Sequence, residues 1–168
     1  MAFTIFFATS TGKTEDVADR LKELLGTDAK DVADISSIDE LTSADALVCC
    51  IPTWNTGADE ARSGTAWDDL IQEIPDKNFQ GKPVAILGLG DSSGYGDNFC
   101  DAMEELYTAF NQSGAKLIGK VPTEGYTFEE SKSVINGKFC GLPIDEDSES
   151  DLTDERLSAW VKQISAEA

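Results

Sequence analysis

The sequence contains no histidine, little positive charge and no long apolar run. Without histidine, the chain lacks the side chain that most often serves as a general base or a metal ligand. Only 13 of its 168 residues are Lys or Arg, against 32 Asp or Glu, and the formal net charge is −19 at pH 7. Such a surface repels nucleic acid and anionic membranes and attracts basic partners. Because no apolar run approaches the ~20 residues that cross a bilayer, we expect no membrane insertion.

Cysteine is also scarce and follows no motif. Cys49, Cys50, Cys100 and Cys140 form no C-x-x-C pair and no metal-ligand spacing, so no metal site is expected. Cys49 and Cys50 lie within an apolar run, where buried thiols are common. Free thiols fit a reducing compartment. Apolar residues begin almost at once, with no visible signal peptide, so the cytoplasm is the expected location.

Short apolar runs alternate with stretches of helical period along the chain. Residues 46–51 and 83–89 are continuously apolar, as strands buried on both faces are, and residues 3–8 are nearly so. Apolar residues recur at helical spacing over 17–25, 99–110 and 157–164. This alternation predicts an α/β fold, a parallel sheet with helices on both faces. With no repeat and no linker, residues 1–168 are predicted to form one domain.

The most informative segment is Thr-Ser-Thr-Gly-Lys-Thr at residues 9–14, which follows the first predicted strand and opens a helix. The first N–H groups of a helix have no internal partner and attract anions, and these hydroxyls add donors without charge. A nucleotide-triphosphate P-loop would need glycine at the position of Phe7. An ordinary helix cap would need fewer hydroxyls. The segment therefore favours a single phosphate monoester.

Two more loops follow predicted strands and each carries an aromatic residue. Trp54 lies between a proline and a glycine in residues 52–57, and Tyr95 is flanked by glycines in residues 90–100. Either ring alone is explained by a loop aromatic folded over a strand end. In parallel sheets, however, ligands bind beyond the carboxyl ends of the strands. Two rings beside a monophosphate cradle indicate a planar ring with one phosphate, and flavin mononucleotide (FMN) is the obvious candidate.

Taken together, the three loops resemble those of a known family. The patterns T-x-T-G-x-T at 9–14, P-T-W-N-x-G at 52–57 and G-D-x-x-G-Y-x-D-N-F at 90–99 are similar to the flavin-binding loops of flavodoxins. The resemblance implies a flavodoxin-like, doubly wound, five-stranded parallel sheet with helices on both faces. Residues 119–140 resemble the insertion that splits the last strand in long-chain flavodoxins. Residues 57–67 are most similar to flavodoxins of oxygenic phototrophs, the algae and cyanobacteria.

The resemblance also implies how FMN would be held, without a covalent bond. Residues 9–14 would bind the phosphate, Trp54 would cover the inner flavin face and Tyr95 the outer face. The peptide within residues 55–57 would turn over on reduction. Backbone near residues 89–91 and 98–100 would meet the pyrimidine edge, and Asp147 would reach the ribityl chain. The expected cofactor-binding residues are Thr9, Ser10, Thr11, Gly12, Lys13, Thr14, Pro52, Thr53, Trp54, Asn55, Thr56, Gly57, Leu89, Gly90, Asp91, Tyr95, Asn98, Phe99, Cys100 and Asp147.

The implied function is that of a low-potential one-electron carrier and not of an enzyme. The protein would be a monomer that cycles its flavin between semiquinone and hydroquinone, from photosystem I to ferredoxin-NADP reductase. Asp59, Glu60, Asp68 and Asp69, with the acidic run at 145–151, would form a docking rim for these basic partners. The implied location is the cytoplasm, or the chloroplast stroma of a eukaryotic alga.

Three other classes of protein share part of this pattern. A flavin-dependent NAD(P)H:quinone reductase has a similar fold but usually needs an oligomer to build its second substrate site. A response-regulator receiver needs an acidic pair after the first strand, where this chain has Thr-Ser-Thr. A P-loop nucleotidase is disfavoured by Phe7. A yellow protein that turns blue on partial reduction would separate a flavin carrier from the last two.

Overall fold

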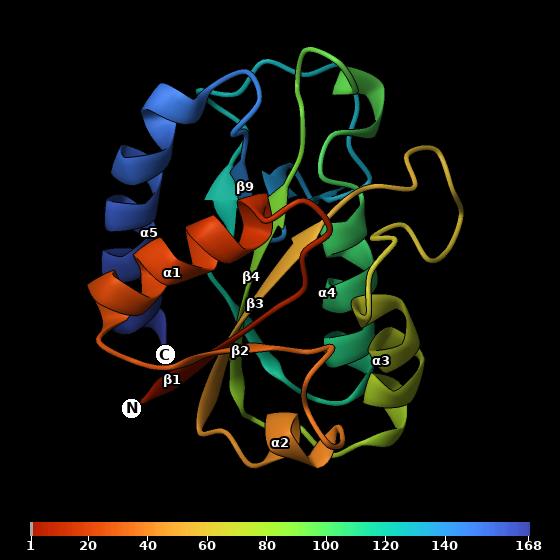
Figure 1. Cartoon of the computed structure of the whole chain (residues 1–168), viewed down its shortest axis with the longest axis vertical. Helices are drawn as coiled ribbons and strands as arrows, with labels where there is room; N and C mark the ends of the chain where they lie inside the picture. The colour runs from red at the N-terminus through yellow and green to blue at the C-terminus, as the bar shows by residue number, and fades with distance from the viewer. Residues whose placement is uncertain (1) are drawn as a thin grey trace.

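The computed structural model describes residues 2–168 (Figure 1). One parallel sheet runs through the molecule in the order β2–β1–β3–β4–β5, a doubly wound order for which flavodoxins are the standard example. Its strands are β1 (Phe3–Phe7), β2 (Ala29–Asp31), β3 (Ala46–Pro52), β4 (Pro83–Leu89) and β5 (Lys116–Ile118). The three strands expected from apolar runs are confirmed, and so is the predicted sheet.

The fifth strand position is divided between two short strands. The first half of β4 pairs with β5, Pro83 opposite Lys116, and its second half pairs with β9 (Leu142–Ile144), Leu87 opposite Leu142. Between them the chain forms a small antiparallel sheet of β6 (Val121–Pro122), β7 (Val134–Ile135) and β8 (Lys138–Phe139). This confirms the predicted insertion.

Helices cover both faces of the sheet. On one face α1 packs against α5, and on the other α3 packs against α4 (Figure 1). The helices are α1 (Lys13–Leu25), α2 (Asp39–Thr42), α3 (Trp67–Glu73), α4 (Ala102–Gln112) and α5 (Thr153–Glu167). Three short 3₁₀ turns complete the elements: η1 (Ile74–Asp76), η2 (Gly96–Asn98) and η3 (Ser150–Leu152). No helix within residues 2–168 is long and apolar enough to span a bilayer.

The core lies between the sheet and its helices, and it contains every cysteine. All residues of β3 and β4 are buried, which explains why their sequences are apolar without alternation. Cys49, Cys50, Cys100 and Cys140 are free thiols with at most 2% of their surface exposed. Burial raises the pKa of the Cys50 thiol to about 12. The prediction that Cys49 and Cys50 are buried is confirmed.

The helix expected from residue 99 begins three residues later, at Ala102. Cys100 has a φ of 53°, in the left-handed region, so a regular helix cannot start before it. Phe99 and Cys100 are therefore the last residues of the loop that precedes α4, although both side chains are buried like those of a helix. Buried loop residues and buried helix residues are both apolar, so the sequence could not separate the end of the loop from the start of the helix.

Candidate functional site

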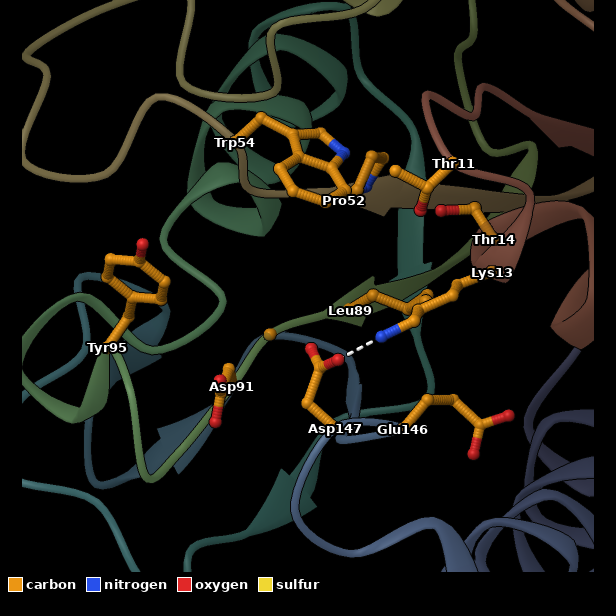
Figure 2. Close-up of a pocket in the computed structure, with 11 residues that line it drawn as sticks. Thr11, Lys13, Thr14, Pro52, Trp54, Leu89, Asp91, Tyr95, Glu146 and Asp147 are labelled. Atoms are coloured by element: carbon orange, nitrogen blue, oxygen red, sulfur yellow. Dashed lines mark hydrogen bonds and ion pairs between the residues drawn. The ribbon is translucent and has the colours of Figure 1, made fainter.

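One pocket lies at the carboxyl ends of β1, β3 and β4, where the strand order reverses. It is built by the three loops singled out in the sequence and by the segment after β9 (Figure 2). The lining residues are Thr11, Lys13, Thr14, Pro52, Trp54, Leu89, Gly90, Asp91, Tyr95, Glu146 and Asp147. Segments far apart in the chain therefore converge where an open α/β sheet binds its ligand.

The first loop presents free backbone donors. Gly12 precedes α1 with a φ of 94°, a left-handed turn that glycine adopts without strain, and its N–H donates to Thr9 Oγ1 at 2.8 Å. Within residues 2–168, no acceptor is found for several neighbouring N–H groups. These N–H groups belong to Ser10, Thr11, Lys13, Thr14 and Glu15. Converging donors at a helix N-terminus suit a phosphate.

Lys13 spans the pocket to reach Asp147. Its ammonium forms an ion pair with the Asp147 carboxylate (Figure 2), and this hydrogen bond raises the pKa of Lys13. Both side chains remain more than 40% exposed, so the pair contributes little to stability. Asp91 and Glu146 line the same pocket. Of these three carboxylates, Asp147 pairs with Lys13 and Glu146 with Arg20, while Asp91 forms no ion pair within residues 2–168.

Two exposed aromatic rings border the pocket. Trp54 has 48% of its surface exposed and Tyr95 has 53%, unusual for rings of this size. They come from different loops and lie at the same pocket with Pro52 and Leu89, which add apolar surface (Figure 2). Exposed rings beside apolar residues, with free backbone N–H donors in the same pocket, suit a flat aromatic ligand with a phosphate tail.

The loop that carries Trp54 is fixed from behind by a buried arginine. Arg62 is 8% exposed and donates to the carbonyls of Ala58 (3.2 Å), Asp59 (2.9 Å) and Asp101 (3.2 Å). It also pairs with Glu104 at 3.1 Å. These bonds join the 57–62 turn to the start of α4. The turn is therefore anchored although most of its residues are exposed.

The loop that carries Tyr95 is fixed by carboxylates. Asp91 Oδ1 accepts from the Ser93 N–H (3.1 Å), the Gly94 N–H (3.0 Å) and the Ser148 hydroxyl (2.7 Å). The Gly94 bond makes the largest contribution to lowering the pKa of Asp91. A side chain at Gly90 would lie 2.9 Å from the Cys100 N atom, so only glycine fits there.

The insertion packs behind this same loop. Phe99 stacks on Phe128 with ring centroids 5.7 Å apart, and the Glu129 and Glu130 N–H groups donate to the Gly96 carbonyl at 2.8 and 3.0 Å. Ser133 Oγ donates to the Cys100 carbonyl at 2.6 Å. Residues 128–133 therefore hold the loop in place from outside the pocket.

The predicted site residues divide into two groups. Ten line the pocket: Thr11, Lys13, Thr14, Pro52, Trp54, Leu89, Gly90, Asp91, Tyr95 and Asp147. The others border it or shape the loops: Thr9, Ser10, Gly12, Thr53, Asn55, Thr56, Gly57, Asn98, Phe99 and Cys100. Thr53 Oγ1 accepts from the Ala102 N–H (3.0 Å), and Asn55 Nδ2 donates to the Ala61 carbonyl (2.6 Å). Phe99 and Cys100 have no exposed surface, and the Phe99 N–H and carbonyl bind Glu130 and Ser131, so their contact with the edge of a ligand stays a prediction.

Sequence reasoning missed four residues that build this site. Glu146 lines the pocket, and Arg62, Ser92 and Asp145 hold its loops. Asp145 was counted with an acidic surface run, but it is fully buried. Its position directly after an apolar segment, at the expected end of a strand, was a signal in the sequence that it could be buried. Asp68, predicted as part of the rim, accepts from Ser63 Oγ and the Gly64 N–H and so has an internal role.

Comparison with known proteins agrees with this geometry. The flavodoxin family model matches residues 5–160. The chain belongs to the flavodoxin family. It is 43% identical to a Nostoc flavodoxin over 165 residues, which cover 97% of this chain and 95% of that protein. It is 44% identical to flavodoxin 1 of Escherichia coli over 171 residues, covering 99% and 95% of the two chains.

Solved structures give the same result. The flavodoxin of Fusobacterium nucleatum bound to flavin mononucleotide superposes with a TM-score of 0.89 at 30% identity, covering 99% of this chain and 98% of that one. The family resemblance drawn from the sequence is confirmed. The Nostoc and Escherichia coli relatives differ by one percentage point in identity to this chain, so identity alone does not select a physiological partner.

Proposed function

We propose that this flavodoxin binds FMN in the pocket between Trp54 and Tyr95 and carries single electrons between proteins. The proposal is supported chiefly by the pocket itself, where phosphate-binding donors face two exposed rings across apolar Pro52 and Leu89. The Fusobacterium relative is bound to the same cofactor. FMN supplies the redox chemistry when bound.

Different residues of the pocket would bind different parts of FMN. Thr11, Thr14 and the free N–H groups of residues 10–15 would hold the phosphate, while Trp54 and Tyr95 would cover the ring. Asp147, which pairs with Lys13, would meet the ribityl chain between ring and phosphate. Glycine at position 90, where a side chain would meet Cys100, would let backbone approach the edge of the ring.

Charged side chains at the pocket would set the one-electron reduction potential of bound FMN. Asp91, which forms no ion pair within residues 2–168, would disfavour negative charge that reduction adds to the ring, while Glu146 and Asp147 are each paired with a cation. Every ~1.4 kcal/mol of such repulsion lowers a one-electron potential by roughly 59 mV. Exclusion of water by the two rings strengthens the repulsion. The chain's own residues thus favour a strongly reducing carrier.

FMN is expected to bind one per chain, and the adenine dinucleotide is expected to bind far more weakly. The donors of residues 10–15 suit a terminal monoester, and the pocket has Lys13 as its one cation among residues 2–168, with no second cation for a pyrophosphate. Titration of the apoprotein by quenching of flavin fluorescence measures both affinities. Equal affinities would contradict the proposed phosphate site.

We further propose that the electron route runs from photosystem I to ferredoxin-NADP reductase. This rests on the resemblance to flavodoxins of phototrophs and on the negative charge near the pocket. Asp59, Glu60 and Asp69 follow the Trp54 loop in the sequence, are exposed and form no ion pair within residues 2–168. We call these three residues the acidic rim. They would offer a basic protein a negatively charged docking surface.

Electron transfer with these two partners is expected to slow as the salt concentration rises. Salt screens the attraction between the proteins, since the Debye length falls from ~30 Å at 0.01 M to ~10 Å at 0.1 M. Steering acts mainly on the association rate. Stopped-flow and flash kinetics should therefore show a lower rate constant at high salt, and a weaker salt dependence when the acidic rim is replaced by D59N, E60Q and D69N together. The matched control neutralises three exposed acids elsewhere, Asp19, Glu23 and Asp28. Equal effects of the two triple variants would show that overall charge matters and the rim does not.

A further inference from the structure

The buried carboxylate of Asp145 joins the two loops that form one wall of the pocket. Asp145 follows β9 directly and has no exposed surface. Its Oδ2 accepts from the N–H of Ser92 at 3.0 Å and from the Ser92 hydroxyl. Its Oδ1 accepts from the N–H groups of Asp147 (3.1 Å) and Ser148 (2.8 Å). One carboxylate therefore holds residues 91–95 on one side and 146–148 on the other.

A second carboxylate makes the reciprocal connection. Asp91, on the first loop, accepts from the hydroxyl of Ser148 on the second at 2.7 Å. Each loop thus supplies an aspartate that binds a serine of the other. Gly90 is also tied to this wall, since its N–H donates to the Ile144 carbonyl at 3.1 Å. Five pocket-lining residues belong to this unit: Gly90, Asp91, Tyr95, Glu146 and Asp147.

Hydrogen bonds alone satisfy the buried carboxylate of Asp145. No ion pair to Asp145 exists within residues 2–168, so its buried charge is balanced by N–H and O–H donors alone. A carboxylate is acceptor-only and matches four donors that arrive from both sides. An amide would present its NH₂ group to one of the two donor pairs and break that side of the link. The geometry demands a carboxylate and not merely a polar side chain.

We propose that Asp145 is a positioning residue that sets the place of Tyr95 relative to Trp54, and thereby the affinity for FMN, without lining the pocket. Trp54 stands on a separate loop anchored by Arg62. The distance between the two rings therefore depends on the hydrogen bonds of Asp145 on one side and those of Arg62 on the other. This inference rests on the proposed function, that FMN binds in this pocket.

The test compares three variants of the full chain. D145N is expected to weaken FMN binding about tenfold or more, equivalent to about 1.4 kcal/mol or more. S92A, which keeps the carboxylate and removes one donor, is expected to weaken it several-fold. S93A is the matched control: it is the same change one residue along, and the Ser93 hydroxyl has no hydrogen bond within residues 2–168. S93A should bind FMN with the same affinity as the parent chain.

Fluorescence quenching gives the dissociation constants, and far-ultraviolet circular dichroism checks that each apoprotein is folded. The visible dichroism of the bound flavin reports the seating of the ring, and it should change in D145N and S92A but not in S93A. Parent-like affinity and dichroism in both folded D145N and folded S92A would overturn the inference. If D145N does not fold, S92A against S93A decides. Failure of the parent chain to bind FMN would instead refute the proposed function, and the inference with it.

Discussion

Replacing Trp54 or Tyr95 with alanine is expected to weaken FMN binding by about 1–3 kcal/mol, the range measured for stacking of bases on aromatic side chains. Both rings already lie half-exposed at the pocket, so their removal costs the folded protein little and acts mainly on the ligand. The one-electron potential for full reduction should also rise, because water would enter and screen the carboxylates. Flavin titration and redox potentiometry measure the two effects.

The matched control is Leu24, the other large apolar side chain that is exposed among residues 2–168. It lies on α1 with 46% of its surface exposed and does not line the pocket. L24A should leave affinity and potential unchanged. If W54A and Y95A behave like L24A, the two rings are ordinary loop aromatics and the site must be reassigned.

Loss of Arg62 is expected to lower the free energy of unfolding of the apoprotein by about 3 kcal/mol, a value typical of breaking a buried ion pair. In R62M, methionine retains most of the apolar length but removes the guanidinium donors to Glu104 and to the three carbonyls. The turn that precedes it should loosen, and with it Trp54. FMN affinity should therefore fall together with stability, which urea unfolding of the apoprotein measures separately.

Lys132 provides a close comparison. Its ammonium donates to the same Ala58 carbonyl, at 3.4 Å, but the residue is exposed. K132M should change stability by no more than about 0.5 kcal/mol, as most surface substitutions do. Equal losses in R62M and K132M would mean that burial of the guanidinium has no special importance for this loop.

The fold and the ligand-facing residues could be read from the sequence because they follow local rules. Unbroken apolar runs identify strands buried on both faces, and hydroxyls with a glycine at a strand-to-helix junction identify a phosphate loop. Trp54 and Tyr95 stood out because no packing period explained them. The split of the fifth strand was recognised by resemblance, since three-residue strands such as β5 and β9 carry too little pattern of their own.

The residues that hold the site from behind were not predictable in this way. The partners of Arg62 include Asp101 and Glu104, roughly forty positions away, and Ser92 lies 53 positions from Asp145. Such pairs form only once the fold brings them together. Composition also misled: an acidic run in a chain of charge −19 looks like a solvated surface. Within it, Asp145 is buried, Glu146 pairs with Arg20 and Glu149 with Arg156.

The four buried thiols give the protein internal reporters of its own motions. A thiol with 2% or less of its surface exposed, and with a pKa raised by burial, reacts with an alkylating reagent only when its surroundings open. Cys49 and Cys50 report on the central strand, Cys100 on the loop behind Tyr95, and Cys140 on the end of the insertion. Their modification rates, followed separately by mass spectrometry, would rank these regions by opening free energy without the introduction of any label.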